Sequence, residues 1–225
     1  MSKLKINNQL GFTIVELLIA TAVFSAILLG ATFALIQVGK MYYKGIVSAR
    51  TQEVARNVTD SISRPIQFQG SGVRSNANAD EILTSGGLTF SKSVRCVGDQ
   101  RFTYVIDLQV DASVPSGSIS GDKIRHALWL DTMPSAADLC VPVDLTQAQP
   151  TAKGSDLLQD HMRLKALEVR QGFTPDLWII DVGVMYGDRD LIEYSGSIPD
   201  RCKGAVSGSQ WCALAEYKTQ VNKRL

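Results

Sequence analysis

The chain has 225 residues, which is enough for one folded domain plus an elongated element and short for two full domains. It carries 23 Lys and Arg against 22 Asp and Glu, and these charges balance once Lys3, Lys5 and Glu16 are set aside. A neutral remainder excludes a strong overall field that would draw in nucleic acid or an anionic membrane.

The N-terminal segment combines a short basic leader with a long apolar run. Residues 1–11 are polar and include Lys3 and Lys5, and Glu16 is the only ionisable side chain from Phe12 to Ile36. About 20 apolar residues are enough to cross a hydrocarbon core as a helix. Basic residues before the span predict a cytoplasmic N-terminus. A secretory signal peptide fits poorly, because its apolar region is shorter and its cleavage site follows that region.

Glu16 is the unexpected residue in this segment. A carboxylate in an apolar helix costs a few kcal/mol in lipid, and such groups usually have a partner. The alternative is that Glu16 lies at the headgroup level and reaches water there.

The stretch GFTIVELLIA, from Gly11 to Ala20, resembles the type IV prepilin cleavage and methylation signature. That pattern has a glycine before the cut, an aromatic first mature residue and a glutamate four residues further on. The resemblance covers about 25 residues. It implies that a membrane aspartyl protease, the prepilin peptidase, cuts between Gly11 and Phe12 and methylates the new amine of Phe12. It also implies that Glu16 compensates the N-terminal ammonium of a neighbouring subunit in a medium of low dielectric.

The same resemblance implies the partners and the location. The partners are the prepilin peptidase, other pilin or pseudopilin subunits, an inner-membrane assembly platform and the lipid bilayer. The location is a single-pass inner membrane protein that later enters an extracellular or periplasmic filament. Phe33 stands where many major pilins have a proline, which favours a minor subunit or a pseudopilin. The head is larger than is typical and the stem ends in ARNVTDSISRPIQF, and in these two respects the chain resembles a minor pilin of the W type or a J-like pseudopilin.

Beyond the span, the sequence predicts a continuing amphipathic helix. Apolar residues recur at spacings of four and seven, which is one face of a helix. They are Tyr43, Val47, Val54, Val58 and Ile62. Pro65 disfavours helical geometry at Arg64, so the helix is expected to end there. The expected segments are a leader (1–11), a transmembrane or filament-core helix (12–38), its amphipathic continuation (39–64) and an extracytoplasmic β-rich head (65–225).

The head is predicted to be an antiparallel sheet packed on the upper helix, so the fold class is α+β, in the manner of a pilin. Residues 69–87 are rich in Gly, Ser and Asn and predict a surface loop. Strands are expected at 102–110, 124–130, 164–169 and 177–186, with turns at 172–175 and 187–190. Short helices are expected near 155–163 and before the C-terminus.

Four cysteines follow the apolar segment, namely Cys96, Cys140, Cys202 and Cys212. The number is even and no C-x-x-C pair occurs, which favours two disulfides on an exported domain over a zinc site or free buried thiols. Three connectivities are open, and proximity favours Cys202–Cys212, which leaves Cys96–Cys140. The shorter loop resembles the C-terminal cystine loops of some pilins. Trp211 beside it is expected to cap the core, with a subunit contact as the alternative.

The sequence indicates no catalytic residue and no cofactor. His126 and His161 stand without partners at ligand spacing, and no Walker or Rossmann fingerprint occurs. Asp188, Asp190 and Glu193 are weak candidates for calcium, since three carboxylates fall short of the six to eight oxygens that calcium takes. A hairpin turn is the favoured interpretation.

Two other functions stay open. A non-polymerising anchor would hold an adhesion or binding domain at the cell surface. A DNA receptor at a filament tip would use the basic cluster Lys218, Lys223 and Arg224. Because the head is neutral overall, nucleic-acid affinity would rest on few phosphate contacts, and an ordinary solvated surface is favoured.

Overall fold

The computed structural model describes residues 13–68, 72–75, 81–85, 88–108, 126–135, 138–147, 149–196, 198–204 and 208–224. The chain divides into two compact units, Met1–Tyr42 and Tyr43–Leu225. The helix α1 (Ile14–Phe68) contributes residues to both units.

The described residues of the first unit are helical from Ile14 onward, and none of their side chains is buried within the chain. Every residue described in it is exposed except Gln37 and Gly39, which are half-buried. Large apolar side chains such as Leu29 and Leu35 keep more than two thirds of their surface exposed. By length and composition α1 is the one described helix that is apolar enough to cross a membrane. This surface needs lipid or other helices to cover it.

In the second unit, residues 43–68 of α1 form a stem with one buried face. Val47, Val54, Val58 and Ile62 are 0–6 % exposed, which confirms the predicted apolar face, whereas Tyr43 is 48 % exposed. Buried hydroxyl groups on the same face donate hydrogen bonds to carbonyl oxygens one turn earlier, at Thr51, Thr59 and Ser63. The buried polar groups are thus satisfied without leaving the helix.

The predicted end of the helix at Arg64 is wrong, because α1 includes Pro65 and ends at Phe68. Proline removes one helical hydrogen bond and disfavours the residue before it. Here Pro65 and Ile66 are both buried, and Ile66 is completely inaccessible. Burial of this last turn offsets the lost hydrogen bond, and the Arg224 amide donates to the Gln67 carbonyl oxygen at 3.1 Å.

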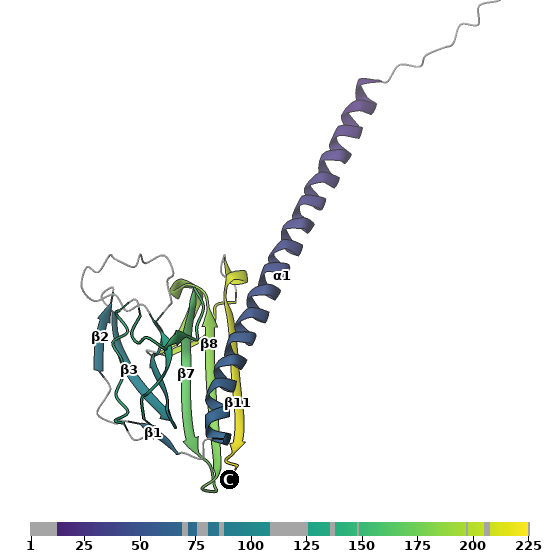
Figure 1. Ribbon diagram of the computed structural model, residues 1–225. Helices are drawn as coiled ribbons and strands as arrows, with labels where there is room; N and C mark the ends of the chain where they lie inside the picture. Colours follow the sequence, from purple (N-terminus) through teal and green to yellow (C-terminus); the bar gives the residue numbers. More distant parts are fainter. Residues whose placement is uncertain are drawn as a thin grey trace, which may run out of the picture. The chain divides into compact units, whose positions relative to one another are not determined.

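A three-stranded antiparallel sheet packs beside the stem (Figure 1), with strand order β11-β8-β7. Its strands are β7 (Met162–Gln171), β8 (Leu177–Tyr186) and β11 (Ala213–Asn222). β11 pairs with β8 along its whole length of ten residues. The predicted strand 177–186 and the turn that precedes it are confirmed, and 164–169 lies inside β7.

A second antiparallel sheet has the order β1-β3-β4-β5-β6, with β2 paired to β3 outside that path. Its strands are β1 (Val73–Ser75), β2 (Glu81–Ser85), β3 (Leu88–Val97), β4 (Gln100–Val105), β5 (Leu128–Thr132) and β6 (Ser155–Asp156). The hairpin β9 (Ile192–Ser195) and β10 (Ile198–Cys202) and the 3-10 helices η1 (Arg189–Leu191) and η2 (Ser209–Trp211) complete the described elements.

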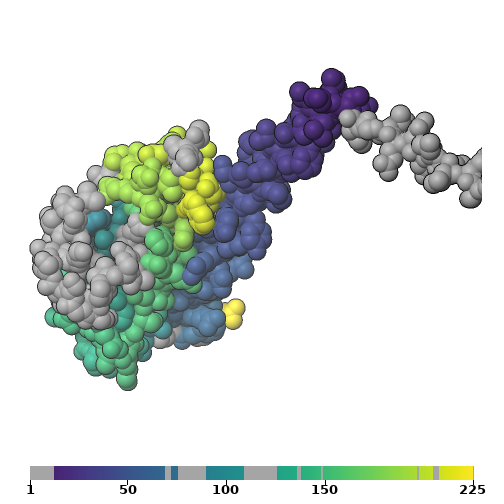
Figure 2. All heavy atoms as spheres, turned by 90° about the horizontal axis from the view of Figure 1, so that it is seen from above, coloured from purple at the N-terminus to yellow at the C-terminus, as the bar shows by residue number. Residues whose placement is uncertain are grey.

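One hydrophobic core joins the stem to both sheets. Ile62 and Ile66 of the stem pack in the same cluster as Phe102 and Leu128 from the larger sheet and Ile180 from β8. All five are at most 1 % exposed. Figure 2 shows the blue stem residues against the yellow C-terminal residues. The long helix followed by antiparallel sheets is the α+β, pilin-like layout that the sequence predicts.

Both predicted short helices are wrong. The segment near 155–163 contains β6 and the start of β7, and Met162 is completely buried opposite Tyr186. The C-terminal segment is β11, in which Ala215 and Val221 are buried and Glu216 is exposed. Strand pairing with β8 therefore outweighs the helix propensity of LAEYK.

Two other boundaries differ from expectation. The predicted loop at 69–87 contains β1 and β2, which pair with β3. The strand expected from Phe102 stops at Val105, because Asp107 adopts a left-handed backbone with φ of 61°. The outer parts of the strands predicted at 102–110 and 124–130 lie outside the described residues.

Candidate functional site

The first turn of α1 contains a reciprocal cap between Thr13 and Glu16. The amide and the hydroxyl of Thr13 donate to Glu16 Oε2 at 2.9 and 2.8 Å, and the Glu16 amide donates to Thr13 Oγ1 at 3.2 Å. Three residues separate them, which is the spacing of a capping box. Glu16 therefore has partners within its own chain, and its negative charge lies at the positive end of the helix dipole.

Sequence reasoning missed this role of Thr13, although the signal was present. Thr-x-x-Glu before an apolar run predicts a helix N-terminus. Gly11 and Phe12, the predicted cleavage pair, lie outside the described residues. The capping residue Thr13 directly follows Phe12, and α1 begins at Ile14.

The apolar helix that follows Glu16 satisfies its own polar groups. The hydroxyls of Thr21, Ser25 and Thr32 donate to carbonyl oxygens three or four residues earlier, at 2.8–3.0 Å. Such internal bonds let hydroxyl residues lie in hydrocarbon without an unmet donor. This part of α1 is suited to a lipid or a helix-packed environment.

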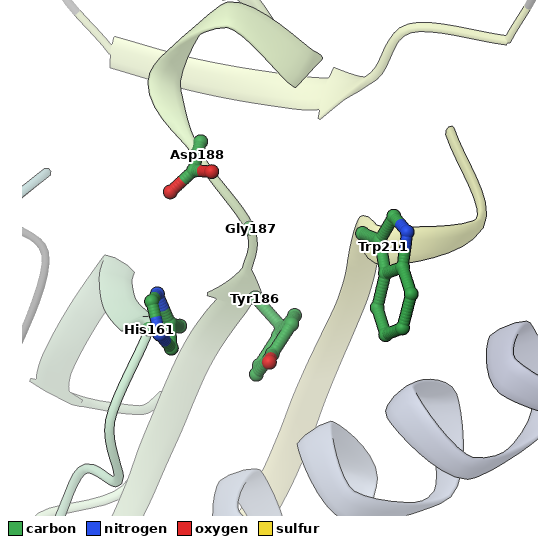
Figure 3. Close-up of a pocket in the computed structure, with 5 residues that line it drawn as sticks. All are labelled: His161, Tyr186, Gly187, Asp188 and Trp211. Atoms are coloured by element: carbon green, nitrogen blue, oxygen red, sulfur yellow. The ribbon is translucent and has the colours of Figure 1, made fainter. Parts of the chain in front are cut away.

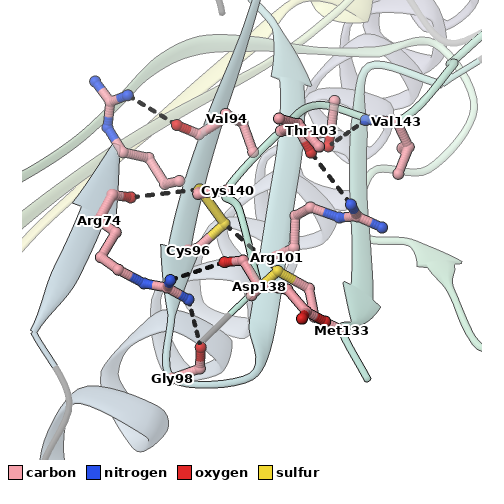
Figure 4. Close-up of a disulfide and its surroundings, with 12 residues drawn as sticks. Arg74, Val94, Cys96, Gly98, Arg101, Thr103, Met133, Asp138, Cys140 and Val143 are labelled. Carbon is pink, nitrogen blue, oxygen red and sulfur yellow. Dashed lines mark hydrogen bonds between the residues drawn. A yellow bond between two sulfur atoms is a disulfide. The ribbon is translucent and has the colours of Figure 1, made fainter. Parts of the chain in front are cut away.

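Both favoured disulfides are present, Cys96–Cys140 and Cys202–Cys212, and no other cysteine occurs. The first joins β3 to the segment after β5 (Figure 4). Arg74 braces it, since its guanidinium donates to the carbonyl oxygens of Asp138 and Gly98 at 2.9 and 3.3 Å. The second disulfide joins the end of β10 to the residue before β11.

A pocket of about 180 Å³ lies at the end of β8 and is lined by His161, Tyr186, Gly187, Asp188 and Trp211. Figure 3 shows the Trp211 indole beside η2 and above α1, and the Tyr186 ring lies between it and the His161 imidazole in this view. Trp211 is 42 % exposed, so its predicted core position is wrong, and its ring packs on Tyr43 at 4.9 Å.

Each of the two histidines lies beside an aspartate. His126 is buried, with Nδ1 bonded to Asp156 and Nε2 2.9 Å from the Gln147 carbonyl oxygen. His161 has a left-handed backbone with φ of 60° in the turn before β7. His126 therefore has the bonding of a structural histidine.

The calcium hypothesis gains no support from the part of the chain that the structure describes. No group of three or more His, Cys, Asp or Glu side chains there is arranged to hold a metal ion. Asp188 precedes η1, Asp190 lies within it, and the Glu193 carboxylate accepts a hydrogen bond from Arg201.

Two side chains of the basic cluster proposed for DNA, Lys218 and Arg224, contact other side chains of the chain. Lys218 Nζ lies 3.9 Å from an Asp181 carboxylate oxygen, and the Arg224 guanidinium lies over the Phe68 ring. Lys223 uses its backbone amide to bond the Asp176 carbonyl oxygen. Engaged cations offer fewer phosphate contacts than free ones.

A buried ionic cluster in the head has no counterpart in the sequence prediction. Arg163 of β7, 2 % exposed, donates from Nη1 to Asp107 Oδ1 at 2.9 Å and from Nη2 to the Gly187 carbonyl oxygen at 3.1 Å. The Tyr194 hydroxyl donates to the same Asp107 oxygen at 3.0 Å. Burial raises the pKa of Tyr194, an effect that Arg163 opposes, and the hydroxyl keeps its proton at neutral pH.

Comparison with known proteins gives one match. Residues 6–32 match the family described as the prokaryotic N-terminal methylation motif, which is the type IV pilin signature. The match includes Gly11, Phe12 and Glu16, and the long apolar helix fits the same class. No curated protein and no solved structure matches the chain. The N-terminal part of the chain therefore carries the type IV pilin signature.

The motif supports a type IV pilin-like or pseudopilin subunit, a structural class that is usually not enzymatic. It implies a substrate of the prepilin peptidase and assembly with other pilin subunits. Together with the apolar helix, it supports membrane anchoring.

Proposed function

We propose that the chain is a minor pilin or pseudopilin of a type IV pilus or a related type II secretion filament. A prepilin peptidase cuts between Gly11 and Phe12 and methylates the amine of Phe12. The mature protein stays anchored in the inner membrane and then joins the filament by packing its helix α1 against the other subunits.

One observation carries this proposal, namely where the signature residues lie relative to the start of α1. The cut falls one residue before the capping residue Thr13, and Glu16 lies in the first helical turn. The apolar surface that follows is exposed along the first unit. Removing the polar leader therefore leaves a new charged amine at the start of a helix whose apolar surface is available for packing.

Glu16 supplies the polar element of assembly in this proposal. In the membrane, its carboxylate is held by the amide and hydroxyl of Thr13. In the filament, the same carboxylate meets the methylated amine of Phe12 on a neighbouring subunit. A charge pair in low dielectric is strongly attractive, and a missing partner leaves a buried charge unpaired.

Mass spectrometry of the N-terminus tests the processing step. In cells that carry a prepilin peptidase, we expect a mature chain that begins with N-methylated Phe12. A Gly11→Ala variant is expected to retain residues 1–11. If the wild-type chain keeps residues 1–11 in such cells, the protein is an uncleaved anchor for a surface domain and the proposal fails.

Sheared filaments test the assembly step. We expect Glu16→Ala to lower the amount of the subunit in the filament fraction at least tenfold, because an ammonium is left without its counter-charge. Glu53→Ala is the matched control, since Glu53 is an exposed acid on the stem. Normal filament incorporation of both Gly11→Ala and Glu16→Ala would contradict the proposal.

A further inference from the structure

A pocket of about 340 Å³ opens between the stem and the loop that the Cys202–Cys212 disulfide closes. This is near the lower end of the range of small-molecule sites, which span roughly 300–1,000 Å³. Three cations line it, Lys44, Arg201 and Lys203, and no carboxylate is among its described lining residues. We call it the basic pocket.

Two parts of the fold build the basic pocket. Lys44 and Ser48 lie four residues apart on α1, so they share one face of the helix. Arg201 and Lys203 flank Cys202 at the end of β10. The disulfide fixes this end of β10 to the start of β11, which holds the two cations opposite the stem.

The charge of the basic pocket is only partly balanced. Arg201 bonds the Glu193 carboxylate. Lys203 Nζ donates to the Asp190 carbonyl oxygen at 2.7 Å, which is a neutral acceptor. Among the described residues, neither Lys203 nor Lys44 forms an ion pair with a carboxylate. The ammonium groups of Lys44 and Lys203 and the hydroxyl of Ser48 can therefore bind an anion that enters the pocket.

We propose that the basic pocket binds the phosphate of an anionic phospholipid headgroup. Lysines and an arginine around a hydroxyl are ordinary phosphate ligands, and basic pockets next to a span recognise lipid headgroups. The neutrality of the chain overall does not oppose this, because the charge is local to the pocket.

The position of Lys44 in the sequence identifies the lipid as the source of the phosphate. Lys44 lies eight residues after Ile36, where the apolar run ends, and it comes directly after Tyr42 and Tyr43. Tyrosines and basic residues at the end of a span are typical of the membrane–water interface. The proposal rests on membrane anchoring and not on cleavage or polymerisation.

Native mass spectrometry of the full-length chain in detergent tests lipid binding, with phosphatidylglycerol and phosphatidylcholine added in separate titrations. We expect one phosphatidylglycerol to remain bound and phosphatidylcholine to bind far more weakly. The variant Lys44→Gln/Lys203→Gln is expected to bind phosphatidylglycerol roughly thirtyfold more weakly. The control variant Lys153→Gln/Lys218→Gln removes two exposed cations elsewhere and is expected to bind normally.

A third titration with inorganic phosphate separates the two sources of phosphate. We expect millimolar phosphate to leave the bound phosphatidylglycerol in place. Displacement of the lipid by phosphate would assign the pocket to a free anion and overturn the lipid assignment. Equal phosphatidylglycerol binding by the wild type and the Lys44→Gln/Lys203→Gln variant would overturn it as well.

Unchanged circular dichroism and intact disulfides show that a variant is folded. Because lipid binding is measured without the peptidase, its failure leaves cleavage after Gly11 untested and unaffected.

Discussion

Asp107 is the residue on which the buried ionic cluster depends. It accepts from Arg163 and Tyr194, and Arg189 Nη1 lies 3.5 Å from its second carboxylate oxygen. Its left-handed backbone suits Asp or Asn better than most residues. One carboxylate therefore joins the end of β4 to β7, η1 and β9.

We expect Asp107→Asn to lower the free energy of unfolding by about 3 kcal/mol, because Arg163 loses its buried counter-ion while the backbone conformation is kept. Urea denaturation of the full chain in detergent, followed by tryptophan fluorescence, measures the change. Arg201→Gln breaks an exposed ion pair and is expected to cost less than about 1 kcal/mol. Equal effects of the two variants would contradict this account.

At the scale of elements, the two disulfides close loops of different length. Cys96 and Cys140 are 44 residues apart, and Cys202 and Cys212 are 10 apart. Loop-closure entropy gives about 4 kcal/mol for the first and about 3 kcal/mol for the second. We expect the double Cys→Ser change at 96 and 140 to lower the urea midpoint more than the change at 202 and 212. If loss of the 202–212 disulfide lowered the urea midpoint more, the loops would not behave as flexible segments in the unfolded chain.

The stem face gives the second prediction at this scale. Ile62 is 1 % exposed in the core, whereas Ile46 is 45 % exposed on the same helix. We expect Ile62→Ala to cost about 2–5 kcal/mol through the cavity it leaves, and Ile46→Ala to cost less than about 1 kcal/mol. Similar urea midpoints for the two variants would mean that the stem does not pack as described.

The sequence predicted elements wherever a local pattern coincides with the tertiary environment. The helix face at Val54 and Val58 and the strand 177–186 are such cases. The local pattern gave a wrong prediction at Pro65, where the helix continues because its last turn is buried. It also gave a wrong prediction for β11, whose partner β8 lies far away in sequence. The cap at Thr13 could have been predicted from the spacing between Thr13 and Glu16. The contact of Arg163 with Asp107 could not have been predicted, because 56 residues separate the pair.

At the scale of the whole molecule, the hydrophobic core lies entirely in the second unit. None of the buried core residues comes from residues 13–42, the described part of the first unit. We expect a chain that starts at Tyr43 to be soluble without detergent and to unfold at the same urea concentration as the full chain, within about 10 %. Aggregation or a broad, non-cooperative transition would show that the apolar helix is needed for folding.

The pairing of β11 has a consequence for the order in which the molecule is completed. Every other described strand is synthesised before β11, yet β11 forms ten paired positions with β8 and places Val221 in the core. Until that strand emerges, β8 lacks a partner on one edge and part of the stem stays uncovered. A nascent or truncated chain without β11 would thus expose an open sheet edge to proteases and chaperones.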